Sequence, residues 1–127
     1  MTLSREAAWN LLTEWTQSES LRKHALAVEA AVRGYARQQG ANEEEWAVVA
    51  LLHDFDYECW PTVEGHPFEG NKILVERGWP EEIRTAIMGH ADYTGVARET
   101  LMAKTLFASD ELTGFVTAVA TTRESSS

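Results

Sequence analysis

The stretch ALLHDFD, residues 50–56, decides how the rest of the chain must be arranged. It ends an apolar run with a histidine and an aspartate side by side, His53 and Asp54. A carboxylate at the end of such a run is costly to bury unless a cation or several hydrogen-bond donors satisfy it. Both side chains can reach one metal ion, so the stretch predicts a metal site to which other segments bring further ligands.

The length and composition are those of one compact domain spanning residues 1–127. The single cysteine, Cys59, excludes an internal disulfide and is typical of a reducing compartment. No apolar run approaches the roughly 18 residues of a membrane span, and the N-terminus has no signal-peptide pattern. We therefore expect a soluble, cytoplasmic protein with no membrane contact.

The chain is acidic, with 20 Asp and Glu against 11 Lys and Arg and a formal net charge of −9. This charge disfavours contact with the phosphates of a nucleic-acid polymer, so we expect no nucleic-acid partner. A small phosphorylated molecule is still compatible with an acidic chain if metal ions supply positive charge locally.

The hydrophobic pattern predicts an all-α fold, a single compact bundle of about six helices. Only three prolines occur, and β-branched alternation is almost absent. Ser4 and the pair Asn42 and Glu45 are N-cap signals, whereas Gly40 and Gly78 are C-cap signals. The helices are expected over residues 4–16, 19–39, 43–53, 67–77, 80–90 and from 98 onward through Leu112, Phe115, Val116 and Val119, with an ordered loop at 55–65 and a polar, frayed tail at 121–127.

A histidine or an aspartate interrupts the apolar face of four of these helices. Each of them alone is more often a hydrogen-bonded core residue than a ligand. One metal centre, however, explains all of them together, and imidazole with carboxylate suits Mn, Fe, Mg, Co or Zn. The four residues and their apolar neighbours are His24 (with Leu21, Ala25, Val28, Val32 and Tyr35), His53 (with Trp46, Val49 and Ala50), His90 (with Ile83 and Ile87) and Asp110 (with Ala103, Leu106 and Phe107).

The ordered set His24, His53-Asp54 and Asp110 resembles the H…HD…D signature of the HD-domain superfamily of metal-dependent phosphohydrolases. The resemblance covers residues 21 to about 115. The segments HDFDYE, GHPFEG, GHADYTG and ASDELTGF are similar to those of small bacterial proteins predicted to be HD hydrolases.

The resemblance implies a set of metal ligands. Asp54 would bridge from the first metal to a second one held by His66 and His90, as in a six-ligand, two-metal branch of the superfamily. Whether one or two divalent ions bind stays open, because histidines at the start of a helix or the edge of a loop are common. The ligands of the first metal would be His24, His53, Asp54 and Asp110.

Proton transfer and phosphate binding require further side chains. Many relatives have an acid at the third position after the HD aspartate, where this chain has Tyr57. We therefore expect Asp56 or Glu58 to assist Asp54 as the catalytic acids. The lysines that we expect to contact a phosphate are Lys23, Lys72 and Lys104.

The function expected from this resemblance is hydrolysis of a small phosphorylated metabolite or nucleotide by a metal-activated water. Two alternatives stay open: an HD-fold diiron oxygenase that oxidises C–H bonds, and a non-catalytic module that binds metal or senses a ligand. Relatives often continue well past the last ligand, so a second subunit could close the substrate cleft. A homodimer is therefore a further expectation.

Overall fold

The computed structural model describes residues 4–126, with side chains described for residues 4–113. Within this range no strand occurs, and the prediction of an all-α bundle of about six helices is confirmed. The elements are α1 (Arg5–Trp15), α2 (Glu19–Gln39), α3 (Glu43–Leu52), α4 (Phe68–Glu76), α5 (Glu81–Gly89), the short 3-10 helix η1 (Asp92–Thr94) and α6 (Leu101–Ser126).

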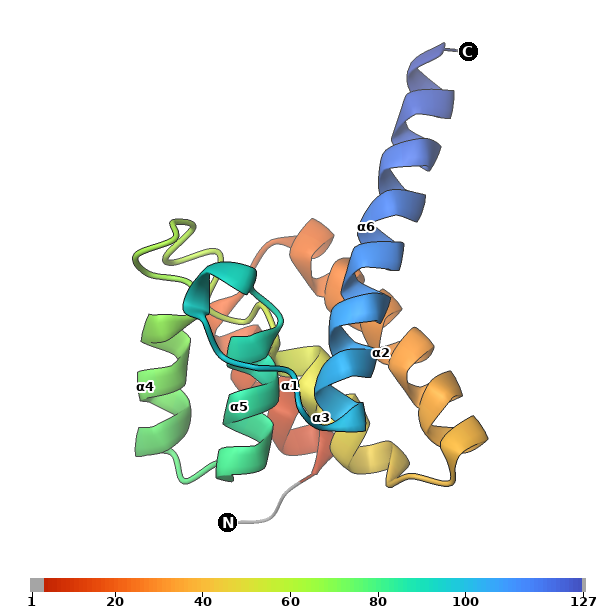
Figure 1. Ribbon diagram of the computed structural model, residues 1–127. Coiled ribbons are helices and arrows are strands. Elements are labelled where there is room, and N and C mark those ends of the chain that lie inside the picture. Colours follow the sequence, from red (N-terminus) through yellow and green to blue (C-terminus); the bar gives the residue numbers. More distant parts are fainter. Residues whose placement is uncertain (1–3, 127) are drawn as a thin grey trace.

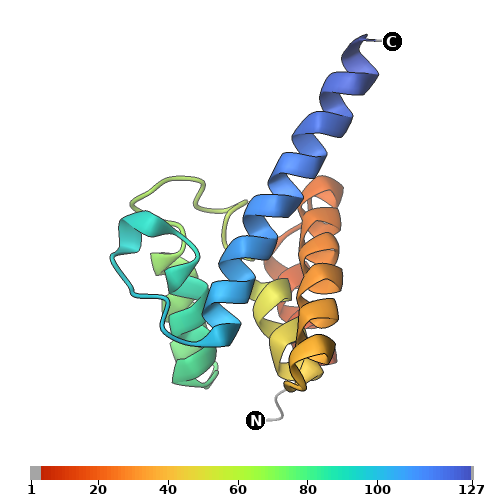
Figure 2. The same ribbon diagram turned by 45° about the vertical axis from the view of Figure 1, so that its right-hand side comes forward.

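Helix α3 is the centre of the fold. It lies between α5 and α2 in both views (Figures 1 and 2), and residues 46–52 are all buried. The predicted one-sided inward face through Trp46, Val49 and Ala50 was therefore incomplete. Alanine, valine or leucine at every position from 47 to 52 lets neighbouring helices cover α3 on all sides.

Capping side chains begin the first three helices, and a glycine ends the second. Ser4, Ser18 and Asn42 each accept a hydrogen bond from a backbone N–H in the first turn of α1, α2 and α3. These N–H groups have no carbonyl partner within their helix. Gly40 ends α2 with a φ of 68°, a left-handed conformation that favours glycine.

One predicted inward side chain of α2 faces solvent. Tyr35 is 43% exposed, whereas Val28, Val32 and Ala36 are fully buried. These three residues recur at intervals of four and so lie along one line of the helix. Tyr35 is the residue before Ala36, so its side chain lies off this line and is directed outward.

The first five helices begin and end within one residue of the predicted bounds, but α4 and α6 differ from the prediction in how they begin. Pro67 lies just before α4 instead of opening it, and the His66–Pro67 peptide bond is cis. Helix α6 begins at Leu101, where the hydroxyl of Thr100 accepts a hydrogen bond from the Ala103 N–H, rather than near residue 98. Its backbone continues as a helix through 126, where a frayed tail was expected. The side chains of Phe115, Val116, Val119 and the tail, and the whole of Ser127, lie outside the described residues.

Ion pairs join the first three helices. Arg5 of α1 and Arg33 of α2 contact the buried Glu29 of α2 at 2.8 and 3.2 Å. Arg33 and Arg37 also contact Glu43, the first residue of α3, at 2.9 and 2.8 Å. These contacts hold the start of α3 against α2. They therefore help to orient the α3 helix as a whole, including its last turn.

Helix α6 lies between two halves of the bundle. Figures 1 and 2 show α4 and α5 on one side of it and α2 on the other, with the C-terminal turns of α6 projecting beyond the rest. None of the described helices combines the length and the apolar character that crossing a lipid bilayer requires. The seam between the two halves is where the predicted ligands meet.

Candidate metal centre

The structure brings all six predicted metal ligands together. They form two groups whose nitrogen and oxygen atoms lie within 4.8 Å of one another in each group. Helix ends supply most of them, because a side chain just beyond a helix can turn across the end of that helix. His24 and Asp110 come from α2 and α6, His53 and Asp54 follow α3, His66 precedes α4, and His90 follows α5.

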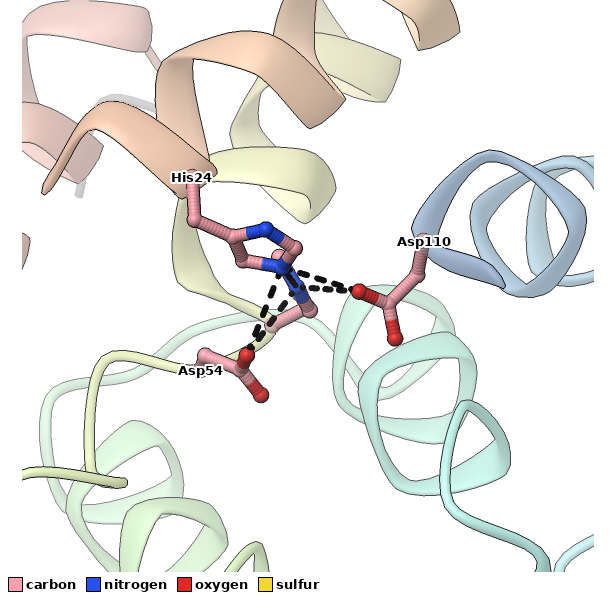
Figure 3. Close-up of side chains that lie close together, drawn as sticks. His24, Asp54 and Asp110 are labelled. Carbon is pink, nitrogen blue, oxygen red and sulfur yellow. Dashed lines mark hydrogen bonds and ion pairs between the residues drawn. The ribbon is translucent and has the colours of Figure 1, made fainter. Parts of the chain in front are cut away.

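The first group contains His24, His53, Asp54 and Asp110. Nε2 of His24 lies 2.9 Å from Oδ1 of Asp110 and 3.7 Å from Oδ2 of Asp54. Nε2 of His53 lies 3.2 Å from Oδ1 of Asp110 and 3.3 Å from Oδ2 of Asp54. Figure 3 shows His24, Asp54 and Asp110 pointing toward one another from three parts of the chain.

The second group contains Asp54, His66 and His90. Oδ1 of Asp54 lies 3.1 Å from Nε2 of His66 and 3.2 Å from Nε2 of His90. The two imidazole nitrogens are 3.3 Å apart. Asp54 thus directs one oxygen to each group, which is the arrangement of a carboxylate that bridges two cations.

The distances within each group fit donors around one cation. Metal–nitrogen bonds of about 2.1 Å place neighbouring donors about 3.0–3.4 Å apart at tetrahedral or octahedral angles. The Nε2 atoms of His24 and His53 are 3.3 Å apart, as are those of His66 and His90. Two unprotonated nitrogens at this distance repel each other unless a proton or a cation lies between them.

Hydrogen bonds at Nδ1 orient three of the imidazoles. Nδ1 of His53 donates to the carbonyl oxygen of Ala50 at 2.6 Å, and Nδ1 of His90 donates to that of Ile87. Nδ1 of His66 donates to Oδ1 of Asp56, also at 2.6 Å. A proton on Nδ1 leaves the lone pair of Nε2 free to bind a metal.

The charges within the centre shift its pKa values in opposite directions. Burial opposes protonation of His66, but hydrogen bonds to Asp54 and Asp56 outweigh it and raise the pKa of His66 to about 9. Burial likewise opposes ionisation of Asp110, but hydrogen bonds to His24 and His53 hold the pKa of Asp110 below its ordinary value. The centre therefore attracts positive charge, which protons or a divalent cation that displaces them can provide.

One side of the centre is open to solvent. The side chains of His24, Asp54 and Asp110 are 23%, 23% and 25% exposed. His53, His66 and His90 are buried behind them. Solvent can therefore reach the centre on the side of His24 and the two aspartates.

Neither Asp56 nor Glu58 is placed for the proton transfer that we predicted. Asp56 is buried, and its two oxygens bond to His66 and to the N–H of Gly70. Glu58 is exposed, and its carboxylate accepts hydrogen bonds from the N–H groups of Gln17 and Ser18 just before α2. The acids closest to the HD pair in sequence are thus occupied by structural contacts.

The three predicted phosphate-binding lysines do not lie at the centre. Lys23 and Lys72 are each 72% exposed and pair with Glu19 and Glu69 of their own helices. Lys72 is two residues from Gly70, which faces Asp56, and two residues turn a helix through more than half of its circumference. Lys104 is exposed beside Tyr35 on the outer face of α2 and α6.

Sequence reasoning missed two residues that hold His66. The hydroxyl of Tyr93 donates to the His66 carbonyl oxygen, and a Cβ atom added to Gly70 would lie 2.7 Å from the Asp56 carboxylate. Gly70 and Tyr93 belong to the segments GHPFEG and GHADYTG, of which only the histidines are assigned to the metal centre from the sequence. Nothing in the local pattern indicates that the two segments meet.

The chain belongs to the HD domain family, which matches residues 21–114. The match includes all six residues of the two groups. Proteins of this family are generally hydrolases, and HD domains bind divalent metals. No curated protein and no solved structure matches the chain.

Proposed function

We propose that the protein is a metal-dependent phosphohydrolase that acts on a small phosphorylated metabolite or nucleotide. The observation that carries this proposal is that the two donor groups share Asp54, which directs one carboxylate oxygen to each group. Two divalent cations held in this way would activate a water molecule and stabilise the charge of a phosphoryl group during in-line displacement.

The protein's own residues would hold and orient these cations. His24, His53 and Asp110 would complete the first site, and His66 and His90 the second, with Asp54 in both. The hydrogen bonds at Nδ1 keep the Nε2 lone pairs directed inward. The buried histidines exclude water from one side of the centre, so a substrate would approach on the side of the aspartates.

The choice of substrate class follows from charge. Within residues 4–113, no ion pair joins a lysine or an arginine to Asp54 or Asp110. Bound cations would therefore have to offset both the two carboxylates and the charge of the phosphate. The net charge of −9 disfavours a long polyanion, which supports a small substrate.

The test is a phosphatase and phosphodiesterase panel on the metal-free protein supplied in turn with Mn²⁺, Mg²⁺, Co²⁺ and Fe²⁺. We expect hydrolysis with at least one of these ions and its loss in His53→Ala and Asp54→Ala, together with loss of metal uptake. Lys72→Ala is the matched control, because Lys72 is exposed and paired with Glu69, and it should keep full activity.

Three results would contradict the proposal. Full activity in His53→Ala or Asp54→Ala would show that the centre does not catalyse the reaction. Oxygen consumption by an iron-loaded protein that hydrolyses no phosphate ester would favour the oxygenase alternative. Tight metal uptake with no turnover of either kind would favour a binding or sensing module.

A further inference from the structure

We infer that Asp56 is a positioning residue: it holds His66 in the orientation that the second cation site requires. This inference rests on the two-cation centre proposed above, and it assigns Asp56 a function other than proton transfer. Asp56 is 1% exposed, so it cannot meet a substrate directly. Its effect on the centre must pass through the imidazole that it contacts.

The position of His66 explains why it needs such a partner. His53 and His90 follow the last residues of α3 and α5, and each donates its Nδ1 proton to a carbonyl three residues earlier. The last carbonyls of a helix lack the N–H partner four residues further on, so they keep a lone pair for another donor. His66 precedes α4 and follows a turn in which its own N–H donates to the Thr62 carbonyl. No carbonyl of that turn accepts from Nδ1 of His66, so the acceptor comes from another segment. Asp56 provides it.

The carboxylate of Asp56 is held in one orientation. Oδ1 lies 2.6 Å from Nδ1 of His66, and Oδ2 accepts a hydrogen bond from the Gly70 N–H at 2.9 Å. A Cβ atom at position 70 would lie 2.7 Å from both Cγ and Oδ2 of Asp56. Glycine at this position therefore lets the first turn of α4 close on the carboxylate.

Asp56 also balances the charge of the two sites. The first group has Asp110 of its own in addition to the shared Asp54, whereas the second has two imidazoles and the shared Asp54 as its only carboxylate. Asp56 supplies a second carboxylate to that side, one imidazole ring away from the cation. A carboxylate behind a histidine increases the basicity of the ligating nitrogen and strengthens metal binding.

The test measures binding of Co²⁺ to the metal-free protein by calorimetry and visible absorption, without any substrate. Asp56→Asn keeps the shape of the side chain but leaves only one acceptor oxygen. If that oxygen accepts from the Gly70 N–H, the NH2 group of the new asparagine side chain faces Nδ1 of His66 and donates to it. The ring proton of His66 then moves to Nε2, where it blocks metal binding. We expect two Co²⁺ per wild-type chain and, in Asp56→Asn, an unchanged first site with the second about 10- to 100-fold weaker.

Gly70→Ala provides a second route to the same result, because it displaces the carboxylate while leaving its chemistry intact. We expect the second Co²⁺ to bind more weakly in this variant also. Gly34→Ala on α2 is the matched control, since an added Cβ there meets nothing within 4 Å, and both sites should bind as in the wild type. A purely structural role of Asp56 would weaken both sites equally, so the difference between the sites is the decisive measurement.

Equal binding of two Co²⁺ ions by Asp56→Asn and the wild type would overturn the inference, and so would a wild-type chain that takes up only one. If Asp56→Asn does not fold, Gly70→Ala decides in the same way. Because the titration involves no phosphate ester, a protein that loses its second site as expected but hydrolyses nothing would refute the proposed activity and leave the role of Asp56 standing.

Discussion

At the scale of single residues, the direction of each ligand depends on contacts outside the centre. The imidazoles of His53 and His90 are oriented by the last turns of their own helices, and that of His66 by Asp56. The same dependence on a partner applies to surface carboxylates. Glu43 contacts both Arg33 and Arg37, and these hydrogen bonds lower the pKa of Glu43 to about 2.

The lowered pKa of Glu43 predicts a pH-dependent contribution to stability. Because the folded-state pKa of Glu43 is below its ordinary value of 4.5, the stabilisation is fully present above pH 4.5 and is lost as the pH falls toward 2. We expect Glu43→Gln to lower the thermal midpoint modestly at pH 7, with a difference from the wild type that shrinks below pH 4.5. Thermal unfolding followed by circular dichroism between pH 7 and pH 3 measures this difference.

The control for Glu43→Gln is Glu45→Gln, which removes the same charge from the same helical turn. Within the described side chains Glu45 forms no ion pair, so its replacement should have a smaller effect at pH 7. Identical pH profiles for the two variants would contradict a specific role of the arginine contacts.

At the scale of elements, α3 couples the core to the centre. Its enclosed residues fix the helix in place, and the chain leaves it directly at His53 and Asp54. A loss of packing in α3 should therefore reduce stability and disturb both ligands. The buried Phe55, whose carbonyl oxygen accepts a hydrogen bond from the Thr16 hydroxyl, anchors the chain on the other side of the pair.

We predict that Leu51→Ala lowers the free energy of unfolding by about 2–5 kcal/mol, because Leu51 is fully buried and its truncation leaves a cavity. Leu112→Ala is the control of the same chemistry, and since Leu112 is 52% exposed, its effect should stay within about 0.5 kcal/mol. Urea denaturation of both variants provides the comparison. Similar losses in the two variants would contradict the central position of α3.

At the scale of the whole molecule, the centre joins five segments that lie far apart in the sequence. Its ligands come from α2, the end of α3, the start of α4, the end of α5 and α6. A cation bound to these ligands in the folded state would stabilise that state, because the unfolded chain does not assemble the same set of donors.

Removal of metal should therefore lower the thermal midpoint of the whole protein. A cation present at 100 times its dissociation constant contributes about 2.7 kcal/mol of stability, and we expect the midpoint to rise with the concentration of added Mn²⁺ or Co²⁺. Differential scanning fluorimetry of chelator-treated protein measures this rise. Asp54→Ala should show little of it, whereas an equal shift in that variant would place the stabilising ion elsewhere.

The resemblance at the sequence level anticipated much of the centre but not its surroundings. Helical spacing indicated His24, His53, His90 and Asp110, and the resemblance to the HD-domain superfamily implied the full set of six ligands. Asp56, Glu58 and the three lysines were assigned by proximity in sequence or by charge. Proximity was misleading because the three acids after α3, each two residues from the next, point in different directions: Asp54 into the centre, Asp56 behind His66 and Glu58 toward the start of α2.

The helices, several of their caps and most of the inward-facing polar residues could be predicted from the sequence, because these features depend on spacing and on contacts only a few residues apart. The packing of the helices sets the remaining features: which acid orients which histidine, how Asp54 presents one oxygen to each group, and how Gly70 closes on Asp56. Those contacts join residues 10 to 86 positions apart, and their geometry depends on how the helices pack against one another.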